Sequence, residues 1–95
     1  MRQYRFAPLA EHDLESIWQY TAQHWSPAQA DRYVSDLFDT VEGIATGALN
    51  GRPVDVRDGY LKCRSGAHMI YFRQDDEAVI IVRNLHQSMD VQRHL

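Results

Sequence analysis

Apolar positions recur every three or four residues over two stretches in the first half of the chain, the pattern of amphipathic helices. The first stretch follows Pro8, and the second follows Ser26-Pro27, where serine supplies a side-chain cap and proline fits the first helical position. Because only a residue or two separates these helices, we expect an antiparallel helical hairpin. Gly47 and Pro53 then predict the end of helical structure and a polar loop.

Shorter segments bounded by turn residues flank this hairpin and predict strands over residues 3–6, 60–64, 67–74 and 78–85. The last is apolar on both faces, which favours an interior strand. The order β-α-α-β-β-β predicts an α+β two-layer domain, in which an N-terminal strand and a three-stranded antiparallel meander carry the hairpin on one face. Counting chain reversals, we expect the N-terminal strand to pair antiparallel with the 60–64 or the 78–85 strand, and the sequence does not choose between them.

Length and composition narrow the class of protein. Ninety-five residues, of which 44% are hydrophobic, predict a single folded domain spanning 1–95. Apolar runs are too short to span a bilayer, and the charged N-terminus does not resemble a secretion signal. The single cysteine, Cys63, excludes an internal disulfide and fits a reducing compartment. We therefore expect a cytoplasmic protein that does not bind a membrane.

Charge is distributed unevenly along the chain, although the net charge is only −3. Residues 1–47 carry seven acidic side chains and three arginines, whereas residues 48–95 carry seven cations and six acids. Nine of the ten cations are arginine, which favours bidentate contacts with carboxylate or phosphate. The acidic total argues against general nucleic-acid affinity, and no direct sequence-specific nucleic-acid binding is expected, but a local arginine-bearing face suits a specific acidic partner.

Candidate chemistry in the tail begins with His86, Asp90 and His94, whose spacing would suit a zinc site on one helix. His86 directly follows the predicted interior strand, so the three side chains are not expected to share a helix. We therefore predict no metal ion and no cofactor. Asp90 is instead expected to cap a final helical turn that reaches Arg93.

A phosphodiester-cutting site would need a general base, a general acid and cationic groups that hold the scissile phosphate. His68 and His86, with Arg64, Arg73 and Arg83, lie on or beside adjacent predicted strands. The interpretation we favour places Arg73 and Arg83 on a solvated sheet face, paired with carboxylates.

Aromatic residues at helical spacing are normally part of a core. We therefore expect Trp18, Trp25, Tyr33 and Phe38 to be buried. An aromatic side chain left exposed on the rim of the hairpin would instead receive an amphipathic helix of a partner.

Four segments of the chain resemble the RelE/ParE toxin superfamily. They are Asp13-Leu14-x-x-Ile17-x-x-Tyr20, Ala30-x-x-Tyr33-Val34-x-x-Leu37, Gly66-x-His68-x-Ile70-Tyr71-Phe72-Arg73 and Val79-x-Ile81-x-x-x-Leu85-His86-x-x-Met89-Asp90-x-x-x-His94-Leu95. The last is similar to the ending of ParE toxins in particular. The resemblance covers almost the whole chain and agrees with the predicted fold.

The resemblance implies the toxin of a bacterial type II toxin–antitoxin pair. RelE-like members cut mRNA on the ribosome with lysines and arginines of the sheet and a tyrosine near the C-terminus. Here Lys62 is the only lysine and Tyr71 the last tyrosine. The resemblance therefore favours a ParE-like inhibitor of DNA gyrase that is not itself an enzyme. The alternatives are a ribosome-dependent mRNA endonuclease and an inactive antitoxin-binding module.

The resemblance also implies two partners, DNA gyrase and a cognate antitoxin with a DNA-binding domain and a disordered tail. An acidic, amphipathic tail would suit the arginine-bearing sheet and the rim of the hairpin. Partner contacts are expected at Arg64, Arg73, Arg83, His86, Met89, Asp90 and Arg93. We expect part of the segment 86–95 to meet the target; in the alternative, Met89 and Leu95 only fix it to the core.

Overall fold

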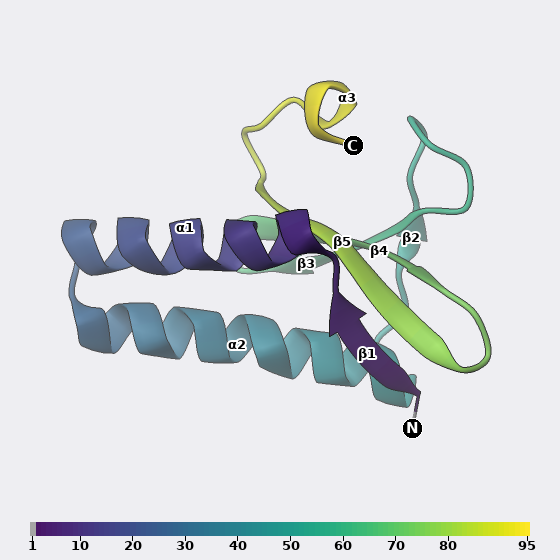
Figure 1. Cartoon of the computed structure of the whole chain (residues 1–95), viewed down its shortest axis with the longest axis horizontal. Helices are drawn as coiled ribbons and strands as arrows, with labels where there is room; N and C mark the ends of the chain where they lie inside the picture. Colours follow the sequence, from purple (N-terminus) through teal and green to yellow (C-terminus); the bar gives the residue numbers. More distant parts are fainter. Residues whose placement is uncertain (1) are drawn as a thin grey trace.

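Two helices form one layer of the protein and a five-stranded sheet forms the other (Figure 1). The computed structural model describes residues 2–95. Its elements are β1 (Gln3–Phe6), α1 (Pro8–His24), α2 (Pro27–Thr46), β2 (Arg52–Pro53), β3 (Leu61–Ser65), β4 (His68–Gln74), β5 (Ala78–His86) and α3 (Val91–His94). The predicted α+β two-layer architecture is confirmed.

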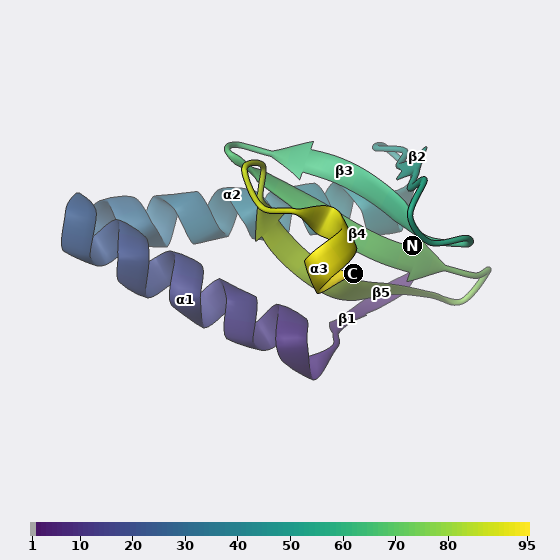
Figure 2. The same ribbon diagram turned by 90° about the horizontal axis from the view of Figure 1, so that it is seen from above.

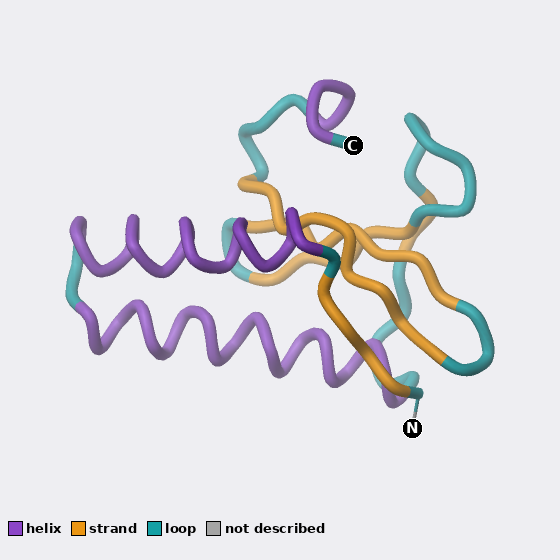
Figure 3. The backbone as a smooth tube through the Cα atoms, in the orientation of Figure 1, coloured by secondary structure: helices purple, strands orange, loops and turns teal. Residues whose placement is uncertain are grey.

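The helical hairpin is defined by signals that are local in the sequence. The Ser26 hydroxyl accepts a hydrogen bond of 3.0 Å from the backbone N–H of Gln29, and Pro27 is the first residue of α2. Gly47 ends α2 with a left-handed φ of 85°, a conformation that glycine adopts without a steric penalty. The short connection between the helices and the longer loop that carries β2 can be followed in Figure 3.

The sheet has the order β1-β5-β4-β3-β2. The antiparallel meander β3-β4-β5 is as predicted. The antiparallel pairing expected for β1 is wrong, because β1 runs parallel to β5, with Gln3 opposite Ala78 and Phe6 opposite Ile81. The reason is an extra chain reversal: β2 is antiparallel to β3, so the chain turns once more between α2 and the meander.

Alternating residues of the sheet build two apolar clusters, one on each face. Ile70 and Phe72 face the helices and pack with buried residues of α1, α2 and β5. Tyr71 points to the opposite face, where it packs with Val54 and Leu85. We call these the inner and the outer face. Figure 2 shows α3 over β4 and β5, and the partly buried residues packed on the outer cluster include Val91 and Leu95 of this tail.

Burial of the helix aromatics differs from the prediction. Tyr33 packs against the inner cluster, but Trp18 is 36%, Phe38 37% and Trp25 70% exposed. The far end of the hairpin extends beyond the strands (Figure 1), so the apolar stripe at that end, where Trp25 follows α1, has no sheet to cover. Phe38 instead packs edge-on against Phe6 of β1, with 5.4 Å between the ring centroids, and remains partly exposed. Within residues 2–95, no helix is both long and apolar enough to cross a membrane.

Candidate functional site

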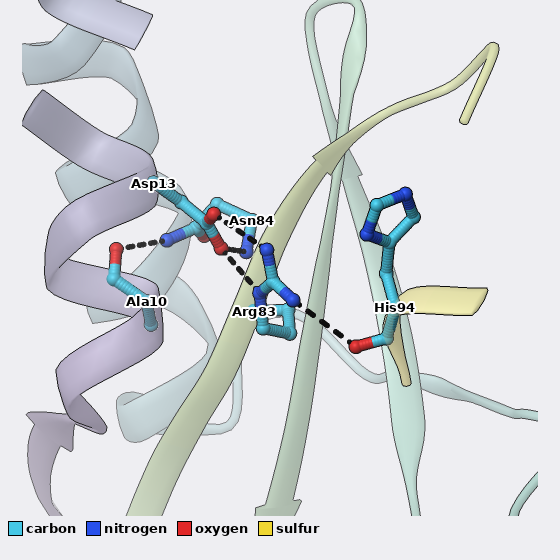
Figure 4. Close-up of polar contacts among 5 residues, drawn as sticks. All are labelled: Ala10, Asp13, Arg83, Asn84 and His94. Carbon is cyan, nitrogen blue, oxygen red and sulfur yellow. Dashed lines mark hydrogen bonds and ion pairs between the residues drawn. The ribbon is translucent and has the colours of Figure 1, made fainter. Parts of the chain in front are cut away.

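Arg83 on β5 and Asp13 on α1 form a bidentate ion pair (Figure 4). The Arg83 Nε and Nη2 atoms donate to the two Asp13 carboxylate oxygens, each at 2.8 Å. The side chains are only 16% and 10% exposed, and no other ion pair joins the residues that the structure describes. The hydrogen bonds to Asp13 raise the pKa of Arg83. The expected pairing of Arg83 with a carboxylate is thus confirmed, but its expected solvated setting is wrong, because the pair is largely removed from solvent. Arg73, for which the same pairing was expected, forms no ion pair within the described residues.

The position of Asp13 follows from the short length of β1. Because β1 pairs with β5 only as far as Ile81, the edge of β5 beyond it lacks a neighbouring strand. There the Asp13 Oδ2 atom accepts the backbone N–H of Asn84 at 2.9 Å. The Asn84 Nδ2 atom donates to the Ala10 carbonyl at 3.3 Å, which ties the first turns of α1 to the same strand. The Asp13 carboxylate therefore accepts hydrogen bonds both from the Arg83 guanidinium and from a backbone N–H at the uncovered edge of β5.

Arg83 also reaches the C-terminal tail. Its Nη1 atom donates to the His94 carbonyl at 3.1 Å, while Arg57 donates to the Leu95 carbonyl at 2.9 Å. Asp90 caps α3 as predicted, accepting the N–H of Gln92 at 3.1 Å. In the alternative for this segment Met89 and Leu95 both fix the tail to the core, but Met89 is 45% exposed. Val91 takes that role beside Leu95.

A second polar group lies where α2 meets the β3–β4 turn. The Tyr33 hydroxyl accepts the N–H of Ala67 at 3.0 Å and shares a hydrogen bond of 2.6 Å with the Nδ1 atom of His68. Burial lowers the pKa of His68 to about 4, and the nearby His86 ring acts in the same direction. The imidazole is therefore neutral near pH 7. Gly66 makes room for this contact, since a Cβ there would lie 2.9 Å from the Tyr33 hydroxyl.

The seven partner-binding candidates do not form one site. Arg64 lies beside the start of the tail, donating to the Gln87 side chain at 3.1 Å, and the His86 Nδ1 atom lies 2.7 Å from the Ser88 hydroxyl. Arg73 lies at the other end of β4, five residues from His68, or about 17 Å along the strand. Met89, Asp90 and Arg93 are exposed on the tail.

No group of three or more histidine, cysteine or carboxylate side chains within residues 2–95 is placed to hold a metal ion. His86 ends β5 and His94 ends α3, so they do not share a helix.

Sequence reasoning did not identify Asp13 and Tyr33 as site residues. The signal for Asp13 was its spacing: it lies three residues after Ala10 and four before Ile17, and all three are buried on α1. A carboxylate on the buried stripe of a helix needs a partner, because an unpaired charge there is costly. The sequence signal for a polar role of Tyr33 was weaker, because a tyrosine at a core position of a helix does not by itself predict a hydrogen bond of its hydroxyl group.

The fold is that of solved bacterial toxins. It matches a chain of the chromosomal ParDE toxin–antitoxin system from Pseudomonas aeruginosa with a TM-score of 0.78 and 20% identity, covering 90% of this chain and 96% of that one. Residues 4–91 match the family described as the ParE toxin of the type II toxin–antitoxin system parDE.

Two relatives carry the name of that family. The chain is 41% identical to Toxin ParE1 of Caulobacter vibrioides, covering all of this chain and 99% of the relative. It is 38% identical to Toxin ParE1 of Mycobacterium tuberculosis, covering 97% and 96%. The chain therefore belongs to the ParE toxin family of type II toxin–antitoxin systems.

Replacing Asp13 with asparagine leaves the shape unchanged but removes the counter-charge of Arg83. We expect Asp13→Asn to lower the free energy of unfolding by about 3 kcal/mol, measured by urea denaturation, since it leaves a guanidinium largely buried and unpaired. The matched control is Glu15→Gln, an exposed position on the same helix, which should change stability by less than about 0.5 kcal/mol. Equal effects of the two substitutions would contradict the assigned role of Asp13.

The low pKa of His68 makes stability depend on pH. Between about pH 6.5 and pH 4 the unfolded chain binds a proton at His68 that the folded protein does not, so stability falls as the pH falls through this range. His68→Asn keeps a polar side chain that can hydrogen-bond the Tyr33 hydroxyl but cannot titrate. We expect a shallower decline in its urea midpoint from pH 7 to pH 4.5, whereas the exposed His12→Asn should behave like the wild type. An unchanged slope in His68→Asn would be evidence against this assignment.

Proposed function

We propose that this toxin inhibits DNA gyrase and does not cut mRNA. The observation that carries the proposal is the engagement of Arg83: Nε and Nη2 contact Asp13, and Nη1 contacts the His94 carbonyl. A cation held in this way is not free to bind a scissile phosphate. The one hydrogen bond of His68 through Nδ1 goes to Tyr33, and Arg73 lies far along the same strand.

The alternative of RNA cleavage needs these groups to converge on one phosphate. Their internal contacts and their separation support inhibition by protein contact instead. Family membership supports the same conclusion, because the chain matches the ParE toxins over residues 4–91.

We further propose that a cognate antitoxin neutralises the toxin. The helical layer exposes large apolar side chains on both helices, and such side chains are typical of protein interaction sites. They are Trp18, Tyr20 and Trp25 on α1 and Phe38 on α2. An amphipathic segment of the antitoxin would bury them and stabilise the native toxin in proportion to its affinity.

The tail is the part of the candidate set that we propose as the gyrase contact. Met89 and Arg93 are exposed, whereas Val91 and Leu95 pack on the outer cluster. Within this segment the exposed side chains can therefore be changed separately from those that hold it in place. Arg64, Arg73 and His86 remain further candidates for partner contacts.

The central prediction compares two reactions. Purified toxin should inhibit supercoiling of relaxed plasmid by gyrase and leave mRNA on translating ribosomes intact, and addition of the antitoxin should restore supercoiling. Agarose gels report the first reaction and primer extension on mRNA the second. Cleavage of ribosome-bound mRNA with normal supercoiling would establish the endonuclease alternative. If the purified protein neither inhibits supercoiling nor cleaves mRNA but still binds the antitoxin, it is an inactive antitoxin-binding module.

A second prediction tests the tail without removing its anchors. The double substitution Met89→Ser with Arg93→Gln should reduce gyrase inhibition at least tenfold while the melting temperature changes by less than about 2 °C, because both side chains are exposed. Gln92→Ala, an exposed neighbour on α3, is the matched control. Full inhibition by the double variant would mean that the tail is structural and that the gyrase contact lies elsewhere.

A further inference from the structure

Besides Arg83, five cations lie on the outer face of the sheet by strand register. Four of them carry the inference, Arg52 on β2, Lys62 and Arg64 on β3, and Arg73 on β4, whereas the fifth, Arg5 on β1, lies near the Asp75 carboxylate. We propose that this cationic face binds the phosphate backbone of duplex DNA, independently of sequence. The inference extends the proposed function, since DNA is the substrate that gyrase holds, and would add a direct DNA contact to inhibition of the enzyme.

Strand register places two of these cations on the outer face. Lys62 lies opposite Tyr71, and Arg64 lies opposite Met69, and both partners belong to the outer cluster. Directly opposed residues share a face of a sheet. The alternate residues of β3, Leu61 and Cys63, pack on the inner cluster instead.

The other two cations follow by the same rule. Arg52 is directly opposite Lys62, so it shares the outer face. Arg73 lies two residues beyond Tyr71 on β4 and opposite Ile80. The face thus carries positive charge on three neighbouring strands, from the β2 edge into the middle of the sheet.

None of these four cations forms an ion pair within the described residues. The only ion pair within residues 2–95 is that between Arg83 and Asp13, so no carboxylate of the described chain pairs with the four. Arg64 donates to the Gly66 carbonyl and the Gln87 side chain, both uncharged. Arg52 and Lys62 are like charges directly across a strand pair, an arrangement that destabilises a sheet. A bound polyanion removes that repulsion.

Charge on the helical layer has the opposite sign. Arg32 is the single exposed cation of α1 and α2. The exposed acidic residues of these helices are Glu11, Glu15, Asp31, Asp36, Asp39 and Glu42. The protein is therefore polarised, and a polyanion is attracted to the outer face of the sheet and repelled by the helices. This polarity explains how a chain with a net charge of −3 can still present a binding surface for DNA.

The covered centre of the outer face favours phosphate over an amphipathic peptide. The apolar residues Val54, Tyr71 and Leu85 are already buried, and Val91 and Leu95 pack on them. An acidic amphipathic helix needs an exposed apolar surface to pack on as well as cations. A phosphate backbone needs only cations and hydrogen-bond donors, which is what this face leaves exposed.

The test measures binding of the full chain to a fluorescent 30-base-pair duplex by anisotropy at several salt concentrations. Each neutralised phosphate contributes about −0.9 to the slope of log K against log salt, so four contacts predict a slope of about −3.6. The variant Arg52→Gln with Lys62→Gln should reduce this slope by about half and also weaken gyrase inhibition. Arg32→Gln removes one charge from the acidic layer and should change neither.

Two duplex results would overturn the inference: no duplex binding by the wild type at low salt, or duplex binding by the double variant equal to that of the wild type. A third contrary result is that the double variant no longer binds gyrase in the absence of DNA. That result would indicate that the cations contact an acidic protein partner. If the double variant does not fold, as judged by its melting temperature, Lys62→Gln alone is compared with Arg32→Gln. Failure of the wild type to inhibit gyrase would instead refute the proposed function, and the duplex measurement would still decide this inference.

Discussion

The Asp13–Arg83 ion pair joins three parts of the protein that are distant in sequence. Asp13 belongs to α1, Arg83 to β5, and the remaining Arg83 donor holds the tail through the His94 carbonyl. The same carboxylate accepts the Asn84 N–H at the point where β1 stops covering β5. A paired charge with little solvent exposure costs much more to separate than a surface pair, because each partner would be left poorly solvated. The relative positions of the helices, the sheet and the tail therefore depend on this contact.

This contact also constrains where the protein can act. Because Arg83 is engaged within the fold, the cations proposed for partner contacts are those on the outer face of the sheet and on α3. The helical layer covers the inner face and leaves aromatic rings exposed on both helices and at the end of the hairpin. Apolar and cationic surfaces are thus separated on the two layers. Such a separation would let the proposed antitoxin and the proposed gyrase–DNA target be recognised by different chemistry.

Much of the fold could be predicted from local sequence. Ser26-Pro27 and Gly47 act within one turn of their own helix ends, so their capping roles need no tertiary information. The β3-β4-β5 meander followed from strands joined by tight turns. The parallel pairing of β1 could not be predicted, because β2 is only two residues long and has no periodic signal, yet it reverses the chain. Burial of Trp25 was also overestimated, since helical periodicity identifies an apolar stripe but not how far the neighbouring layer extends.

The sequence by itself determined the helix ends, four of the five strands and, through its motifs, the family. These depend on residues close to one another or on patterns that need no coordinates. Only the tertiary structure decided what the charged residues do. Arg83 and Arg73 look alike in the sequence, since both lie on strands near the core. The structure buries Arg83 against a carboxylate 70 residues away and leaves Arg73 exposed, because long-range register determines which counter-charge lies within reach.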